Sequence, residues 1–170
     1  MRLFLVGFMC SGKSTVGKVL ALRLRLPFVD IDRVVEASVG PLLPYVQRHG
    51  EAAFREQETR VLDELLAGPS AVIATGGGTP AQGANMERML AAGTVVWLDL
   101  PMEVLLPRIE RSGGDRPLLH GLKGEALQRR VQQLLDERSD IYARAHIIVQ
   151  AAVPPTEVAA RITSVLGQES

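Results

Sequence analysis

The segment that most constrains this chain is an apolar run that leads directly into a glycine-rich loop. Residues 7–14 read Gly-Phe-Met-Cys-Ser-Gly-Lys-Ser, which matches the pattern G-x-x-x-x-G-K-[ST]. A strand is predicted just before this loop and a helix just after it, which is the context in which such loops hold phosphate groups. The alternative is a glycine-rich turn without a ligand. The spacing, Lys13, Ser14 and the flanking elements together favour nucleotide binding.

Each part of this loop has a defined role toward a nucleotide. Successive backbone N–H groups point at phosphate oxygens, and the helix that begins near Lys13 adds its positive N-terminal end. Lys13 is expected to reach the β- and γ-phosphates, and the Ser14 hydroxyl is expected to bind Mg²⁺. The sequence therefore predicts a P-loop that binds a nucleotide together with a magnesium ion.

Short apolar strands alternate with helices along the rest of the chain. Strands are expected at residues 2–6, 27–30, 71–75, 95–99 and 146–149. Helices are expected at residues 13–24, 32–38, 41–49, 50–66, 82–92, 101–110, 124–143 and 156–166. Most of the strands are continuously apolar, as in a parallel sheet that is covered on both faces. An α/β fold with right-handed crossovers is predicted, with ligands at the carboxyl ends of its strands.

The composition narrows the possible partners. The chain has 170 residues, which suits a single domain, and its 19 basic residues balance its 19 acidic residues. No bulk field favours nucleic acid or a membrane surface, and no segment approaches the ~20 apolar residues of a membrane span. A signal peptide is not expected, because the apolar start runs straight into the P-loop. One cysteine fits a reducing compartment, and a cytoplasmic location is expected.

Two carboxylates follow the second predicted strand. Asp30 and Asp32 leave this strand at the edge of the sheet where the P-loop also lies. One of them can belong to the Mg²⁺ shell while the other faces the hydroxyl group that accepts phosphate. The alternative is that Asp32 caps the helix that follows it. The neighbouring P-loop favours the chemical interpretation.

Four later features each have a plain structural alternative. Arg55 lies on an amphipathic helix, where it can pair with a glutamate at helical spacing, and Arg138 lies on another helix as a possible surface charge. The three glycines of residues 76–78 suit a positive φ or a close approach of the backbone to a ligand, or a flexible turn. The loop around Arg116 can form a cationic lid or a solvated surface loop. Tyr142 is expected in the core.

Taken in order, these residues resemble the shikimate kinase family, which belongs to the nucleoside-monophosphate-kinase-like P-loop enzymes. The residues that carry the resemblance span nearly the whole chain: the P-loop of residues 7–15, Asp30 and Asp32, Gly50-Glu51 with Phe54-Arg55, Gly76-Gly77-Gly78, Arg116-Pro117-Leu118-Leu119, and Glu137-Arg138 with Tyr142. Each motif is modest alone, whereas the ordered set is specific.

The resemblance implies a three-layer P-loop kinase fold, with a five-stranded parallel sheet in the order 2-3-1-4-5, flanking helices and a lid. The implied single domain covers residues 1–170, with a substrate-binding segment at about 32–60 and the lid at about 111–123. The implied reaction is ATP-dependent phosphorylation of the 3-hydroxyl of shikimate, in the pathway to chorismate and aromatic amino acids. Shikimate is the implied small-molecule partner, ATP and Mg²⁺ are the implied cofactors, and a monomer is expected.

The resemblance also implies a role for individual residues. The implied nucleotide-binding residues are Cys10, Ser11, Gly12, Lys13, Ser14, Thr15, Arg111, which would stack on adenine, and Arg116, which would close onto the phosphates. The implied metal-binding residues are Ser14 and, through water, Asp30. The implied substrate-binding residues are Asp32, Arg55, Gly77 and Arg138, with both arginines on the carboxylate. The implied catalytic residues are Lys13, Asp32 and Arg116, with Asp32 orienting or deprotonating the attacking oxygen.

Several positions depart from the family pattern. Cys10 stands where the family often has glycine, which matters if the loop needs a positive φ there. The lid is short between Gly114 and Arg116. Asp140 replaces a usual proline and, two residues from Arg138, could compete with it electrostatically. The loop at residues 150–155 has no arginine that could meet adenine.

Two alternative functions stay open at this point. Another small-molecule P-loop kinase, such as a gluconate kinase, would share the loop but would lack the two arginines and the triple glycine in this order. A non-catalytic nucleotide-binding module would keep Lys13 and lose the carboxylates, whereas Asp30, Asp32 and Arg116 are all present.

Overall fold

The apolar segment before the P-loop forms the central strand of a parallel sheet. The computed structural model describes residues 1–113 and 116–168. Its strands are β1 (Arg2–Val6), β2 (Phe28–Asp30), β3 (Ala71–Ala74), β4 (Thr94–Asp99) and β5 (Ile147–Gln150). They lie in the order β2-β3-β1-β4-β5, and every neighbouring pair is parallel. Both the fold class and the strand order are confirmed.

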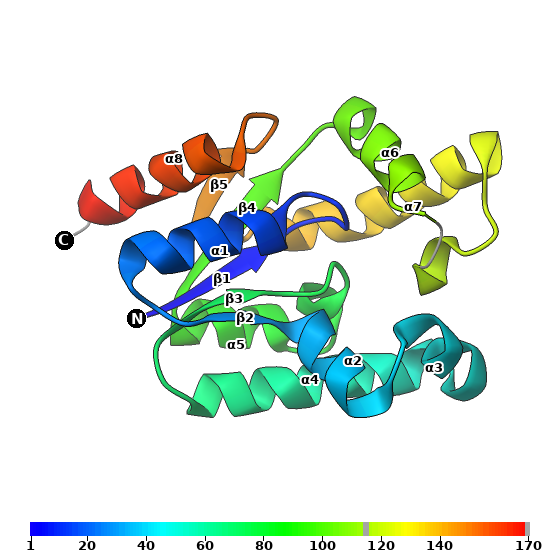
Figure 1. Ribbon diagram of the computed structural model, residues 1–170, viewed down its shortest axis with the longest axis horizontal. Coiled ribbons are helices and arrows are strands. Elements are labelled where there is room, and N and C mark those ends of the chain that lie inside the picture. The colour runs from blue at the N-terminus through cyan, green and yellow to red at the C-terminus, as the bar shows by residue number, and fades with distance from the viewer. Residues whose placement is uncertain (114–115, 169–170) are drawn as a thin grey trace.

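Helices cover the two faces of this sheet, so the molecule has three layers (Figure 1). They are α1 (Lys13–Leu24), α2 (Ile31–Val39), α3 (Leu42–His49), α4 (Glu51–Ala67), α5 (Asn85–Ala92), α6 (Met102–Arg111), α7 (Gly124–Tyr142) and α8 (Pro155–Gln168). Two short 3₁₀ turns, η1 (Thr79–Ala81) and η2 (Pro117–Leu119), were not expected from the sequence. Within the described residues, no helix is both long and apolar enough to cross a membrane.

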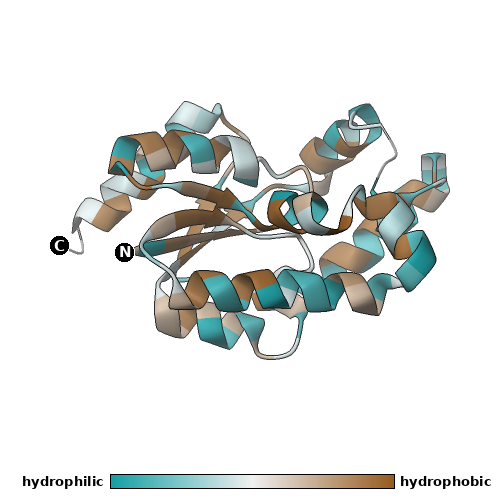
Figure 2. Cartoon of the chain, turned by 60° about the horizontal axis from the view of Figure 1, so that its bottom comes forward, coloured by the Kyte–Doolittle hydropathy of each residue, from teal (hydrophilic) through white to brown (hydrophobic). Residues whose placement is uncertain are grey.

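The alternation of side chains along β1 separates two buried clusters. Leu3 and Leu5 join the first cluster, which holds apolar residues of α1, α6 and α8, whereas Phe4 and Val6 join the second, which holds those of α2, α4 and α5. The long helix α7 contributes to both, with Leu127 in the first cluster and Tyr142 in the second. Figure 2 shows the hydrophobic strands in the middle of the molecule, between helices that carry both hydrophobic and hydrophilic residues.

The strand order decides which motifs can meet. Because β3 lies between β2 and β1, the carboxyl ends of these three strands are neighbours. Asp30 and Asp32 follow β2, the three glycines follow β3, and the P-loop follows β1. A parallel sheet therefore places three motifs that are far apart in sequence at one edge.

Candidate active site

The P-loop connects β1 to α1 and has a positive φ at three residues, of which Gly7 is the first, with a φ of 140°. Gly12, directly before α1, has a φ of 93°, and Cys10 has a φ of 61°. A residue with a side chain rarely adopts this conformation, so Cys10 keeps the backbone path that glycine would take more easily. Cys10 thus adopts a positive φ in spite of its side chain, and its half-buried thiol lines the cavity beside the loop.

Lys13 is held at the centre of this loop. Lys13 is only 8% exposed. Its Nζ donates hydrogen bonds to the carbonyl oxygens of Gly7 and Phe8, at 2.8 and 2.7 Å. Burial lowers the pKa of Lys13 to about 8, while the charge of Asp32 opposes that shift. The loop thus presents a cation beside backbone N–H groups, which is the arrangement that phosphate groups require.

Asp30 joins the P-loop to the start of α2. One of its carboxylate oxygens accepts a hydrogen bond from the Ser14 hydroxyl, and the other accepts from the backbone N–H of Arg33 at 3.4 Å. Asp30 is therefore the N-cap of α2. The capping alternative considered for Asp32 is wrong, because α2 begins one residue earlier than expected and Asp32 lies in its first turn.

The pair Ser14 and Asp30 fits a magnesium ion. A serine hydroxyl and a carboxylate are oxygen ligands of the kind that Mg²⁺ prefers, and both side chains line the cavity. No group of three or more His, Cys, Asp or Glu side chains within residues 1–113 and 116–168 could hold a metal by itself.

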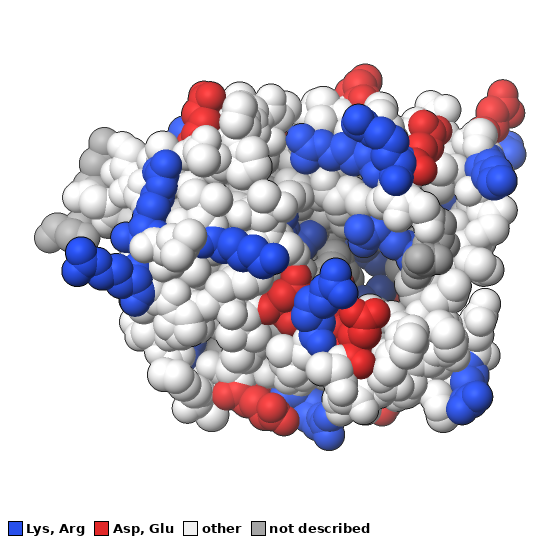
Figure 3. Space-filling view, in the orientation of Figure 1, with Lys and Arg blue, Asp and Glu red and all other residues white. Residues whose placement is uncertain are grey.

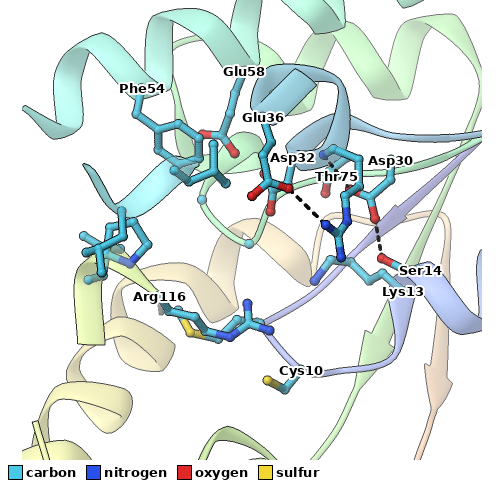
Figure 4. Close-up of a pocket in the computed structure, with 18 of the residues that line it drawn as sticks. Cys10, Lys13, Ser14, Asp30, Asp32, Glu36, Phe54, Glu58, Thr75 and Arg116 are labelled. Carbon is cyan, nitrogen blue, oxygen red and sulfur yellow. Dashed lines mark hydrogen bonds and ion pairs between the residues drawn. The ribbon is translucent and has the colours of Figure 1, made fainter. Parts of the chain in front are cut away.

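Asp32 lies deeper in the cavity, opposite Lys13 and Arg116 (Figure 4). Burial raises its pKa to about 7, and the negative charges of Glu58 and Asp30 add to this shift. Lys13 acts in the opposite direction. Its Oδ1 is buried without a hydrogen-bond partner among the described residues. A carboxylate that titrates near neutral pH beside a phosphate-binding loop can accept a proton from a hydroxyl group.

The three glycines make room for the side chains of the site. None of them has a positive φ, so close approach, rather than backbone freedom, explains them. A Cβ at Gly76 would lie 2.0 Å from Oε1 of Glu58, and one at Gly78 would lie 2.5 Å from Cζ of Arg55. A Cβ at Gly77 would lie 3.3 Å from Nη1 of Arg138. We call residues 76–78 the glycine turn.

Arg55 and Arg138 therefore meet at the glycine turn from two different helices. Arg55 on α4 pairs with Glu58 at 2.6 Å and with Glu51 at 3.3 Å, so the helical pairing considered from the sequence is present. Arg138 on α7 is 6% exposed and lies over the ring of Phe8, with 5.7 Å between its Cζ and the ring centre.

Arg138 differs from Arg55 in having no acidic partner among residues 1–113 and 116–168. No Asp or Glu within the described parts of the chain pairs with it. Asp140 is exposed on another side of α7, and the expected competition is not seen. A buried cation without a counter-ion is unfavourable, so Arg138 favours the binding of an anion.

Glu58 is a residue of the site that sequence analysis missed. It is fully buried, and its two oxygens accept from Arg55 and from the Thr79 hydroxyl, each at 2.6 Å. It thereby fixes Arg55 and ties α4 to η1. The sequence signal was present, because Glu58 lies three residues after Arg55, but that spacing also describes an ordinary surface pair.

The lid side of the cavity is contributed by α6 and η2. Arg116 lines the cavity next to Pro117 and Leu118. Arg108 also lines it, and its Nη1 donates to the Cys10 carbonyl oxygen at 3.4 Å. Arg111 is exposed, does not line the cavity, and donates from Nε to the Pro107 carbonyl oxygen. Residues 114 and 115 of the expected lid lie outside the described residues.

Together these elements enclose one cavity of about 900 Å³. Of the residues proposed from the sequence, the structure brings to its wall Cys10, Gly12, Lys13, Ser14, Thr15, Asp30, Asp32, Arg55, Gly77, Arg116 and Arg138. Ser11 is buried in the loop without lining the cavity. Figure 3 shows the hollow on one face of the molecule, with acidic and basic side chains gathered around its mouth. The cavity has room for a nucleotide and a small anionic acceptor.

Comparison with known proteins agrees with this geometry. The family model described as shikimate kinase matches residues 9–167. A shikimate kinase of Aquifex aeolicus is 42% identical over 163 residues, which cover 95% of this chain and 94% of that protein. A shikimate kinase of Gloeobacter violaceus is 47% identical over 160 residues, which cover 94% of this chain and 88% of that protein.

Solved structures give the same result. The shikimate kinase of Acinetobacter baumannii, solved in complex with shikimate, superposes with a TM-score of 0.91 at 34% identity and covers 99% of this chain and 94% of that one. A gluconokinase of Sinorhizobium meliloti, at 20% identity and a TM-score of 0.61 over 99% of this chain and 97% of that one, shares the fold alone. The chain belongs to the shikimate kinase family.

Proposed function

We propose that this chain transfers the γ-phosphoryl group of ATP to the 3-hydroxyl of shikimate, in the pathway to chorismate and aromatic amino acids. The observation that carries the proposal is that Arg55 and Arg138, from separate helices, converge on the glycine turn. The P-loop lies beside them, together with Asp32, whose pKa is raised to about 7. A small acceptor with a carboxylate at one end and hydroxyl groups at the other fits this arrangement.

The nucleotide would occupy the P-loop side of the cavity. The residues proposed to hold its phosphates are Cys10, Ser11, Gly12, Lys13, Ser14 and Thr15, with Arg116 from the lid side. Adenine would stack on Arg111 at the end of α6, which lies outside the cavity wall, one turn after Arg108 in that wall. Ser14 and, through water, Asp30 would hold Mg²⁺, which when bound neutralises phosphate charge.

The acceptor would occupy the other side, with its carboxylate held by Arg55 and Arg138. Planar guanidinium groups match a carboxylate better than an ammonium group does. Gly77 would offer its backbone to the acceptor, and Asp32 would orient the 3-hydroxyl. Asp32 takes the proton of this hydroxyl as the new oxygen–phosphorus bond forms, the bond between the γ-phosphorus and the bridging oxygen breaks, and ADP leaves.

Lys13 and Arg116 would stabilise the charge that develops on the phosphoryl oxygens. We propose residues 32–60 as the substrate-binding segment and residues 111–123 as the lid, because both flank the cavity. The single chain supplies all of the residues named for the reaction, which supports a monomer. We place the enzyme in the cytoplasm, because its single cysteine fits a reducing compartment.

An ADP-release assay tests the function directly. We expect ADP release that depends on ATP, Mg²⁺ and shikimate, and none with gluconate or without an acceptor. Release with gluconate would favour the related sugar-acid kinases, and binding of ATP without any release would indicate a non-catalytic module. Lys13→Met serves as the inactive control, because Nζ of Lys13 contributes charge rather than apolar packing.

A further inference from the structure

Tyr142 lies where the end of α7 meets the glycine turn. It is 1% exposed, and its ring packs against Trp97 with 5.8 Å between the ring centres. It belongs to the same buried cluster as residues of α2, α4 and α5. Because Tyr142 follows Arg138 by four residues, the two side chains lie on the same face of α7.

The hydroxyl of Tyr142 is directed at the active site rather than at the core. It donates a hydrogen bond to the carbonyl oxygen of Gly77. The Arg138 guanidinium acts on the same hydroxyl through its charge and through hydrogen bonding. Burial raises the pKa of Tyr142 to about 12, so the hydroxyl keeps its proton at neutral pH and remains a donor. A buried tyrosine requires a partner, but this partner belongs to the glycine turn.

Fixing the Gly77 carbonyl also fixes what surrounds it. In a planar trans peptide the N–H of Gly78 points away from the Gly77 oxygen, so holding that oxygen sets the direction of the N–H. A Cβ at Gly78 would meet Arg55, and a Cβ at Gly77 would lie 3.3 Å from both Arg138 Nη1 and the backbone nitrogen of Met9. Arg55, Arg138 and the P-loop therefore all lie close to the glycine turn, to which Tyr142 is hydrogen-bonded.

We propose that Tyr142 is a positioning residue for the acceptor, which acts by locking the Gly77 peptide and the Arg138 guanidinium in one arrangement. It does not touch the substrate. The Tyr142 hydroxyl is bonded to the Gly77 carbonyl oxygen, and the charge of the Arg138 guanidinium acts on the same hydroxyl. This role rests on the proposed function, because it assigns Arg138 to the acceptor's carboxylate.

Tyr142→Phe tests the role, because the ring and its packing on Trp97 stay while the hydroxyl is lost. We expect the KM for shikimate to rise about three- to tenfold, as for the loss of one hydrogen bond, with the KM for ATP unchanged. Trp97→Phe is the matched control, since it alters the packing of the same ring without removing the hydroxyl. It should lower the melting temperature and leave the ratio of the two KM values as it was.

A second comparison separates positioning from simple stabilisation. In an Arg138→Ala background, Tyr142→Phe should raise the KM for shikimate less than it does in the unaltered chain, because one of the two groups that it positions is gone. A lower melting temperature with unchanged KM values, or an equal effect in both backgrounds, would overturn the positioning role. Absence of shikimate phosphorylation by the unaltered chain would contradict the proposed function, and this role with it.

Discussion

Lys13 and Asp32 show how burial prepares single residues for phosphoryl transfer. Burial is the largest influence on both side chains, and it moves the pKa of Lys13 down to about 8 and that of Asp32 up to about 7. Each charge opposes the shift of the other, so the two groups titrate as a linked pair. An acid and a base that both titrate near neutral pH are typical of a site for proton and phosphate chemistry.

Asp32→Asn tests the base directly. It should lower kcat by about 10²- to 10⁴-fold, the usual contribution of a general base, with little change in the KM for ATP. Because only ionised Asp32 accepts a proton, the kcat of the unaltered chain should rise as the pH increases through about 7. The variant should lose this dependence. Steady-state kinetics of both proteins between pH 5.5 and 9, at roughly half-unit steps, test these expectations. If Asp32→Asn lowers kcat by less than about tenfold, Asp32 is only a minor contact.

The same substitution should stabilise the folded chain at high pH. The pKa of Asp32 is about 7 in the folded state against 3.8 for an ordinary aspartate, so the folded chain binds this proton more tightly. Stability from Asp32 is therefore lost as the pH rises from about 4 through 7. Asp32→Asn should melt above the unaltered chain at pH 8, and the difference should vanish toward pH 4. An equal difference at both pH values would contradict the raised pKa.

At the scale of elements, the glycine turn sets the position of the arginines. Gly78→Ala would place a Cβ 2.5 Å from Arg55 Cζ, so the guanidinium must move. We expect the KM for shikimate to rise about tenfold or more, because a displaced Arg55 guanidinium makes a weaker hydrogen bond to the acceptor's carboxylate. The KM for ATP should not change. Gly167→Ala in α8, where a Cβ would meet nothing within 4 Å, is the control. Equal kinetics of the two variants would count against the turn as a constraint.

The two arginine-bearing helices should act as one unit on the acceptor. Arg55→Ala and Arg138→Ala should each raise the KM for shikimate about ten- to 150-fold, from ~1.5–3 kcal/mol per charged hydrogen bond. The double variant should cost less than the sum of the two losses if both hold one carboxylate. Lysine at either position should restore only part of the affinity. Parallel weakening of ATP and acceptor would instead assign both arginines to the structure of the site.

Element by element, the sequence predicted the fold closely, because the strands are short apolar runs and the helices have clear boundaries. The P-loop, both aspartates and both arginines could also be located. The burial of Glu58 could not, because it depends on the packing of η1 against α4, two elements that are distant in sequence. Arg108 rather than Arg111 lines the cavity because of the way α6 is rotated about its axis. The spacing of apolar residues along the sequence predicts this rotation only coarsely.

At the scale of the molecule, the cavity lies between two segments that contact each other at its rim. The turn η2 contacts α3, and Arg116 at the start of η2 lines the cavity. Phosphates that bind Arg116 should hold η2 in place, so hydrogen exchange in residues 116–123 should slow when ATP is added. Residues 155–168, in α8, should exchange equally with and without ATP. The same rate in residues 116–123 under both conditions would exclude a nucleotide-dependent lid.

The central place of β1 has a consequence for the time at which the protein can assemble. β1 is synthesised before both of its neighbours, β3 and β4, and the second of these ends at Asp99. At translation rates of about 5–20 residues per second, β1 waits roughly 5 to 20 seconds for its last partner. During that interval, the strand that carries the P-loop is a hydrophobic segment with unpaired edges in the nascent chain.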